Sequence, residues 1–329
     1  MNTSAVPDSL SDWQPSAALA HLRQRAALLQ SIRDFFAQRH VLEVDTQILS
    51  HCAVSDPFID SITAQYQSVP GGDIQPLYLQ TSPEYAMKRL LAAGSGDIYQ
   101  LGKVFRNGEV GRRHNPEFTL LEWYRVGFSL DDLMDEVESL VSAQIPGWSW
   151  QRVSYRELFL HYLDLDPWTA SLEQLQQACQ QQIEAAFEDD DRDTWLNLLM
   201  SHLIEPQLRG AVFVHSYPPT QAALACVRQD ADGLPVAERF ELYIDGLELA
   251  NGYHELADSQ EQAARLAADQ QQRAALGLPQ RPLEQRLIQA LQQGLPDCSG
   301  VALGVDRLLM RQLGVESIAE VLPFSFERA

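Results

Sequence analysis

Two pairs of apolar segments, each joined by a polar stretch, constrain the fold of this chain most. Residues 98–107 and 118–127 flank the charged loop GEVGRRHNPE, and a second pair flanks Asp245-Gly246. An Asp-Gly pair between alternating segments is typical of a type I′ turn, and a tight hairpin joins antiparallel strands. Because the helical patterns come in blocks, we expect an α+β fold with an antiparallel sheet flanked by helices, not a parallel doubly wound sheet.

The period of the apolar residues predicts the other elements. Over 18–39 the apolar residues recur at helical steps, and Phe35 makes the apolar face wider than packing against one sheet requires. We therefore expect a helix there with a second partner surface. Residues 41–49 alternate apolar and polar, as a half-buried strand does. The same criteria predict further strands over 76–82, 211–217, 238–244 and 299–304, and further helices over 84–93, 130–145, 154–163, 257–276 and 305–314.

Changes in composition divide the chain into a tail and one large domain. Residues 1–17 are small, polar and punctuated by proline, and we expect a flexible N-terminal tail. Residues 18–329 are expected to form one domain, with a Gln-rich, acidic helical insertion at about 165–208. The EDDDRD run in that insertion is typical of exposed charges at a helix start and not of a metal site.

The chain is strongly acidic. Lys and Arg total 24 against 45 Asp and Glu, which gives a formal net charge of −21. Such a surface repels phosphate backbones, so we expect no extensive nucleic-acid contact and a preference for a basic protein partner. The four cysteines lie far apart, no signal-peptide pattern is present, and no run of about 18 apolar residues occurs. These features predict a soluble, cytoplasmic protein with no membrane span.

Two arginines stand where they can hold an anion. Arg106 ends a predicted strand beside the charged loop, and Arg307 follows Gly304 in the first turn of a predicted helix. An arginine fork binds phosphate in a bidentate way, and a helix N-terminus favours anions. Each arginine alone is more typical of a surface or packing position, and only their combination with the motifs below favours a phosphate site.

Three glutamates near the second hairpin follow one another at equal steps of seven: Glu241, Glu248 and Glu255. An odd step along strands places side chains on opposite faces, so the turn at Asp245-Gly246 must reset the register to bring Glu241 and Glu248 together. Paired carboxylates are unfavourable without a cation, and Mg²⁺ prefers carboxylate and phosphate oxygens. The pattern fits either ordinary strand-face charge or a magnesium site. A zinc protease site is not supported, because HELAD lacks the second histidine.

The order of these motifs resembles one family. FRN…RHNPEFTLLEWY, ELANGYHEL and SGVALGVDRLLM, within about residues 18–329, are similar to the catalytic domain of class II aminoacyl-tRNA synthetases of the lysyl type. TSPEYAMKRLLAAG, Ala302 before Leu303-Gly304, and the ending AEVLPFSFERA are similar to elongation factor P β-lysine ligases, stand-alone paralogs of lysyl-tRNA synthetase. Because the first motif begins near residue 18, no anticodon-binding domain is expected.

The resemblance implies a reaction and an assembly. The implied reaction is ATP-dependent activation of (R)-β-lysine, or lysine, to an aminoacyl-adenylate, followed by transfer to a lysine ε-amine of elongation factor P. ATP is a substrate and Mg²⁺ the implied metal. The family pairs through the region of the first helix, so a homodimer is expected.

The resemblance also implies a nucleotide site. Arg106 and Arg307 are the implied catalytic residues, which hold the α-phosphate and the γ-phosphate of ATP. Glu241 and Glu248 are the implied ligands of Mg²⁺. The other implied nucleotide contacts are Asn107, Gly108, Glu109, Asn115, Glu248, Leu249 and Gly304.

The amino-acid pocket of the family matches a second set of residues. Ser82, Pro83 and Glu84 are implied to line it, with Glu84 near the amine on the backbone side. Tyr124 and Glu255 are implied to bind the ε-ammonium group. The implied neighbours are Glu122, Asn251, Tyr253 and Ala302.

Two positions depart from the family pattern. Gln47 stands where the first motif has a proline at the dimer interface. Gly108 stands where the second motif has a glutamate that meets the adenine amino group, and Glu109 follows it. Either Glu109 makes that contact through a backbone shift that glycine allows, or backbone groups and stacking hold the adenine.

Three other functions fit parts of the sequence. A truncated lysyl-tRNA synthetase would act on tRNA, which the net charge of −21 and the expected lack of an anticodon-binding domain disfavour. An asparagine synthetase-like ligase needs a cationic pocket, whereas Glu255 and Tyr124 predict an anionic one. A catalytically inactive regulatory paralog typically lacks the phosphate-binding arginines, and Arg106 and Arg307 are both present. We therefore expect an ATP-dependent aminoacyl ligase that acts on a protein and not on tRNA.

Overall fold

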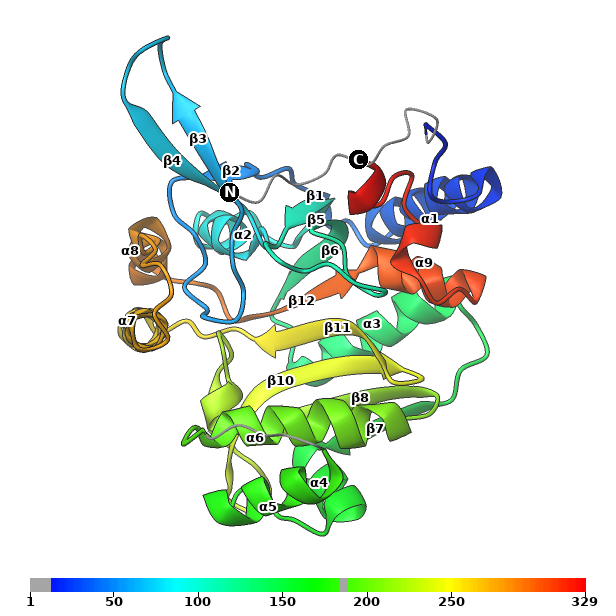
Figure 1. Ribbon diagram of the computed structural model, residues 1–329, viewed down its shortest axis with the longest axis vertical. Helices are drawn as coiled ribbons and strands as arrows, with labels where there is room; N and C mark the ends of the chain where they lie inside the picture. The colour runs from blue at the N-terminus through cyan, green and yellow to red at the C-terminus, as the bar shows by residue number, and fades with distance from the viewer. Residues whose placement is uncertain (1–12, 184–188) are drawn as a thin grey trace, which may run out of the picture.

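A large sheet forms the centre of the computed structural model, which describes residues 13–183 and 189–329. Its strands follow the order β1-β5-β6-β12-β11-β10-β8-β7, and β9 pairs with β10 (Figure 1). The strands of this sheet are β1 Leu42–Glu43, β5 Ile98–Phe105, β6 Glu117–Val126, β7 Trp150–Ser154, β8 Ala211–Tyr217, β9 Val227–Gln229, β10 Pro235–Ile244, β11 Leu247–His254 and β12 Cys298–Gly304.

The pairing confirms the predicted α+β class. The central strands from β5 to β8 pair antiparallel, while β1 with β5 and β7 with β8 add parallel pairings at the two edges. Asp245 and Gly246 have φ angles of 46° and 69°, the left-handed values that a type I′ turn requires. The turn pairs Ile244 with Leu247 and Tyr243 with Glu248, which puts Glu248 on the face that also carries Glu241, as the predicted reset of the register requires. A separate register shift follows between Leu242 and Tyr243.

The strand predicted over 41–49 is wrong as one element. The chain pairs at β1, leaves the large sheet, and pairs again only at β2 Leu49–Ser50 in a second sheet of order β2-β4-β3. Leu42 and Leu49 are 55% and 47% exposed, so their alternation does not face a core. The strands β3 Thr63–Gln67 and β4 Ile74–Leu79 form a hairpin that projects from the body (Figure 1).

One face of the large sheet carries α1, α3 and α9, which share its main core. Their bounds are α1 Leu19–Ala37, α3 Leu130–Gln144 and α9 Val305–Leu313. Phe35, expected to face a second partner, is 7% exposed in this core, and the Arg39 guanidinium lies 3.5 Å from its ring centroid. The expectation that Phe35 faces a second partner is wrong, because Phe35 and Phe36 are both buried in the same core.

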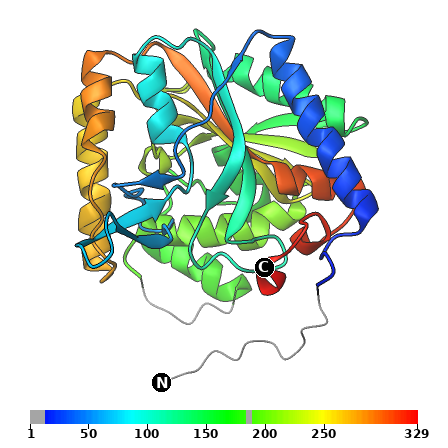
Figure 2. The same ribbon diagram turned by 90° about the horizontal axis from the view of Figure 1, so that it is seen from above.

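Two further groups of helices complete the domain. On the side of the sheet opposite α1 in Figure 2 lie α2 Glu84–Ala92, α7 Ser259–Ala275 and α8 Gln285–Gln293. The region predicted as an insertion, about 165–208, contains α5 Leu172–Gln182, α6 Arg192–Leu199 and a π-helical turn, Met200–Ile204. These elements and α4 Tyr155–Leu163, which precedes that region, form a second apolar core against β8 and β10. Short 3-10 turns occur at Glu205–Gln207, Pro219–Gln221, Ile318–Glu320 and Phe326–Arg328.

Two predictions concern segments that the structure describes only in part. In the EDDDRD run, Glu188 lies outside the described residues, while Asp191 accepts a hydrogen bond from the backbone N–H of Asp193 and caps α6, as a helix start requires. Residues 1–12 of the predicted tail also lie outside them. Ser16 and Ala17 hydrogen-bond to the C-terminal segment, so ordered contacts begin before residue 18.

The sequence predicted cysteines without disulfide bonds and no segment that spans a membrane. Cys52, Cys179, Cys226 and Cys298 are free thiols. Within residues 13–183 and 189–329, every helix is too short or too polar to cross a membrane.

Candidate active site

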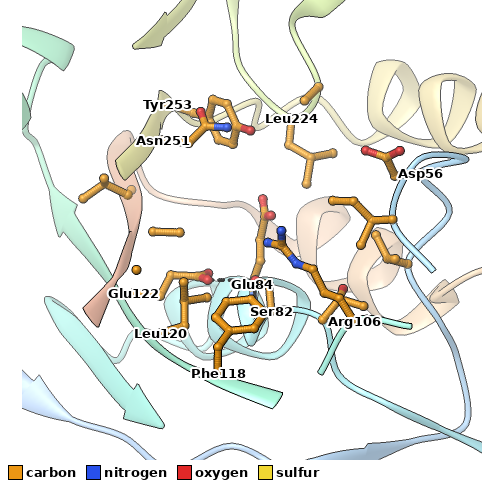
Figure 3. A pocket seen from close by; sticks show the side chains of 18 of the residues that line it. Asp56, Ser82, Glu84, Arg106, Phe118, Leu120, Glu122, Leu224, Asn251 and Tyr253 are labelled. Carbon is orange, nitrogen blue, oxygen red and sulfur yellow. Dashed lines mark hydrogen bonds between the residues drawn. The ribbon is translucent and has the colours of Figure 1, made fainter. Parts of the chain in front are cut away.

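A cavity of about 380 Å³ opens on the face of the sheet formed by β6, β11 and β12. Residues of α2, α7 and the segment 54–59 enclose it from the other sides, and its volume suits a small-molecule ligand. In Figure 3, Glu84, Glu122 and Arg106 lie along one side, with Asn251 and Tyr253 across from them. The predicted site residues that line it are Ser82, Glu84, Arg106, Glu109, Asn115, Glu122, Tyr124, Glu248, Leu249, Asn251, Tyr253, Glu255, Ala302, Gly304 and Arg307.

Four predicted site residues do not line this cavity: Pro83, Asn107, Gly108 and Glu241. Pro83 is the N-cap of α2 and shapes the turn between Ser82 and Glu84. The side-chain amide of Asn107 donates to Asp60 at 2.9 Å. Gly108 has a φ of 79° in the turn that places Glu109 at the cavity wall, an arrangement compatible with Glu109 as the adenine contact.

Three carboxylates make one end of the cavity acidic. Glu84 begins α2, Glu122 lies on β6, and Glu255 follows β11. Glu122 accepts hydrogen bonds from the Ser82 hydroxyl at 2.7 Å and from the Tyr124 hydroxyl at 2.8 Å. Burial, reinforced by the charge of Glu84, raises the pKa of Glu122 to about 8. A cation bound at this end would favour the ionised form of Glu122.

Lys88 was not identified from the sequence, yet it lies at the centre of this acidic end. Its Nζ is 2.8 Å from Glu84 Oε1 and 2.6 Å from Glu255 Oε2, and the Lys88 and Glu255 side chains are each 1% exposed. Burial opposes the charge of Lys88, but the carboxylates of Glu255 and Glu84 outweigh it and raise the pKa of the ammonium. The available signal was the helical step of four from Glu84 to Lys88.

Gly300 on β12 makes room for this arrangement. A Cβ at that position would lie 2.3 Å from the Tyr124 ring and 2.6 Å from Glu255 Oε1. Any side chain there would displace both groups, so the strand needs glycine because of close approach and not because of its backbone angles.

Two arginines make the other end of the cavity basic. Arg307, in the first turn of α9, donates to the Glu248 carbonyl at 2.9 Å and to His114 Nε2 at 2.8 Å. Burial and the neighbouring charge of Arg307 lower the pKa of His114, so its ring is neutral and accepts this bond. Arg106 reaches the cavity from the end of β5 and lies 3.6 Å from Glu109. The sequence did not identify His114 as a support for Arg307.

A buried ion pair connects α1 to this basic end. Arg25 on α1 is 2.5 Å from the carboxylate of Asp306, which precedes Arg307 and also accepts from the Thr119 backbone N–H at 2.7 Å. Both charged side chains are nearly excluded from solvent. The first helix of the chain therefore fixes the start of α9 and with it the position of Arg307.

The two predicted magnesium ligands differ in their surroundings. Glu248 lines the cavity, and desolvation together with the charge of Glu241 raises its pKa. Glu241 accepts from Arg239 at 2.5 Å and from the Tyr217 hydroxyl at 2.8 Å. No group of three or more His, Cys, Asp or Glu side chains arranged to hold a metal occurs among the described residues. Both oxygens of Glu241 already accept hydrogen bonds, so of these two carboxylates only Glu248 lines the cavity.

One cavity thus joins an acidic end, suited to ammonium groups, with a basic end, suited to phosphates. The fold and this site define a class, and the sequence agrees: the chain belongs to the class II tRNA synthetase family (D, K and N), which it matches over residues 8–328.

Three similar proteins within this family share about half of their residues with this chain. The chain is 48% identical to a protein of Photorhabdus laumondii, covering 97% of this chain and 98% of that protein. It is 49% identical to one of Yersinia enterocolitica, covering 96% and 98%. A protein of Vibrio cholerae is 48% identical, with 97% and 99% covered. All three relatives carry the name elongation factor P–(R)-β-lysine ligase.

Proposed function

We propose that this protein activates (R)-β-lysine, or lysine, with ATP to an aminoacyl-adenylate and transfers the aminoacyl group to a lysine ε-amine of elongation factor P. The observation that carries this proposal is a single cavity with carboxylates at one end and Arg106 and Arg307 at the other. The names of the similar proteins support the choice of substrate and acceptor.

The proposed chemistry needs positioned charge more than proton transfer. The amino-acid carboxylate attacks the α-phosphorus in line, and Arg106 stabilises the charge that develops on the α-phosphate. Arg307, held by Glu248 and His114, binds the γ-phosphate and orients the leaving pyrophosphate. When bound by Glu241 and Glu248, Mg²⁺ would supply additional charge neutralisation at the phosphates.

The acidic end determines which amino acid reacts. In this proposal Glu84 binds the amine near the carboxylate, and Glu255 and Tyr124 bind the terminal ammonium. Glu122, with both oxygens already hydrogen-bonded, adds a third carboxylate to the same space, and a bound ammonium favours its ionised form. Asn251, Tyr253 and Ala302 complete the wall on β11 and β12.

The observations disfavour the competing functions. An asparagine synthetase-like ligase would have to bind an anionic side chain beside three carboxylates. An inactive regulatory paralog would not need Arg106 and Arg307 in the same cavity. A tRNA ligase would have to hold a polyanion against a net charge of −21, so tRNA is not proposed as an acceptor.

We also propose a homodimer, through the stretch that contains Gln47 and not through the buried Phe35 face of α1. Leu42, Ile48 and Leu49 are exposed apolar side chains within one short stretch that also contains Gln47. Burying them against a second copy would remove apolar area from water. Free thiols and the use of ATP suit action in a reducing cytoplasm.

Pyrophosphate exchange with a panel of amino acids tests the activation step. Amino acids with two ammonium groups should support exchange, and aspartate and norleucine should not. Exchange driven by aspartate would favour the asparagine synthetase-like alternative, and exchange with no amino acid at all would favour an inactive paralog.

A further inference from the structure

The chain contains two lysines, Lys88 and Lys103, and uses arginine at its other 22 basic positions. Lys103 is a surface residue that pairs with Glu117 at 3.1 Å, with 38% of its side chain exposed. Lys88 is the opposite case, with 1% of its side chain exposed and two carboxylates within 2.8 Å. A compact ammonium fits between two buried carboxylates where the wider guanidinium fork does not.

Lys88 lies behind the cavity wall and not in it. Glu84 and Glu255, its two partners, both line the cavity, as does Glu122. Each partner gives one oxygen to Lys88, Oε1 of Glu84 and Oε2 of Glu255, which leaves the other oxygen for a ligand. The Lys88 ammonium therefore determines the orientation of both carboxylates.

The Lys88 ammonium group also sets the net charge of the acidic end. When all three carboxylates are ionised, the Lys88 ammonium leaves two formal negative charges, which the two ammonium groups of the substrate neutralise. Without Lys88 the three carboxylates would face one another with no cation between them, and they would stay protonated to a still higher pH.

We propose that Lys88 is a positioning residue that determines specificity for amino acids with two ammonium groups. It turns one oxygen of Glu84 and one of Glu255 toward the cavity and keeps the acidic end at the charge that such a substrate balances. This inference rests on the proposed function and adds a residue that acts only through others.

The pH dependence of substrate binding follows from the groups that surround Glu255. Lys88 lowers the pKa values of both Glu255 and Glu122, against the raising effect of burial. Replacing it with a neutral side chain raises both values further, so a higher pH is needed to ionise the acidic end. The ionisable groups that face Glu255 are Lys88 and Glu84 from α2, Glu122 and Tyr124 from β6, Tyr253 from β11, Cys298 from β12 and Cys226 before β9.

The test compares Lys88→Met with Lys103→Met in pyrophosphate exchange with (R)-β-lysine and with lysine. For Lys88→Met we expect a KM for the amino acid that is at least about tenfold higher and a KM for ATP within about twofold of wild type, because the basic end is untouched. The acidic limb of kcat/KM for the amino acid should move to higher pH. Lys103→Met should match the wild type in all three measurements.

Several outcomes separate the possibilities. A Lys88→Met enzyme with unchanged amino-acid KM and unchanged pH profile overturns the role of Lys88, while wild-type exchange still supports the proposed function. Wild-type protein that activates no diamino acid overturns the proposed function itself, and this inference with it. Should Lys88→Met fail to fold, Lys88→Gln keeps a hydrogen-bond donor without the charge and must show the same KM and pH shifts.

Discussion

Replacing Glu255 with glutamine tests the acidic end most directly, because it removes one charge with little change in shape. A charge-assisted contact with an ammonium contributes about 1.5–3 kcal/mol, so the KM for (R)-β-lysine or lysine should rise roughly 10- to 150-fold. Arg106 and Arg307 lie at the other end of the cavity, so the KM for ATP should stay within about twofold of wild type. Pyrophosphate exchange with each substrate varied in turn gives both constants.

The same substitution has a structural effect that must be measured beside it. Breaking a buried ion pair typically costs about 3–5 kcal/mol, but Lys88 keeps Glu84 at 2.8 Å as a partner, so the loss of stability should be smaller. Thermal unfolding should show a lower but cooperative transition. Glu117→Gln, at an exposed pair, is the matched control and should change neither stability nor KM. A folded Glu255→Gln enzyme with an unchanged amino-acid KM would refute the assignment of Glu255.

Four further outcomes are expected. Burial raises the pKa values of Glu122 and Glu255 to about 8, so below that pH a cationic substrate must displace protons from these carboxylates. The KM for the amino acid should therefore fall between about pH 6 and about pH 8, while the KM for ATP stays constant. An amino-acid KM that does not change with pH would contradict this. Gly300→Ala should raise the KM for the amino acid at least about tenfold and lower the unfolding temperature, because the new Cβ displaces Glu255. Wild-type kinetics in this variant would show that Tyr124 and Glu255 can move aside without loss of binding. The hydrogen bonds that His254 donates to Glu238 and to Asp297 outweigh burial and raise its pKa to about 9, so its stabilisation is complete below about pH 6.5 and is lost as pH rises through 9. His254→Gln should therefore lower the unfolding temperature at pH 6 but not at pH 10, and an equal drop at both would refute this. Light scattering should show a dimer that weakens with Leu49→Asp, and a wild-type monomer at micromolar concentration would refute the assembly.

The hairpins and the motif residues were predictable because their signals are local. Asp245-Gly246 specifies a turn through the backbone angles that it tolerates, and that two-residue turn puts Glu248 on the same face as Glu241. Most of the predicted site residues line one cavity for a related reason: they lie in strands and helices whose type the sequence indicates, or in the short segments that adjoin these elements.

The errors involve contacts between distant segments. Periodicity showed that Phe35 is on an apolar face of a helix, but it could not show whether that face meets the same core or another chain. The stretch at 41–49 alternates like one strand, yet its two ends pair with different sheets. Lys88 was missed because a lysine near an apolar run is ordinarily exposed, and only the tertiary fold brings Glu255 to it.

The central claim is that the adenylate formed in this cavity is transferred to a protein lysine. The acceptor amine must arrive neutral, and a lysine with the reference pKa of about 10.4 is almost wholly protonated at neutral pH, so transfer should accelerate as pH rises. Attraction between an acidic protein and a basic partner weakens as the Debye length falls from about 10 Å at 0.1 M salt to about 3 Å at 1 M. Single-turnover transfer from preformed adenylate to elongation factor P should therefore be fast, sensitive to salt and favoured by high pH, while adenylate formation changes much less. Efficient charging of tRNA, or equal salt and pH dependence in both half-reactions, would contradict the claim.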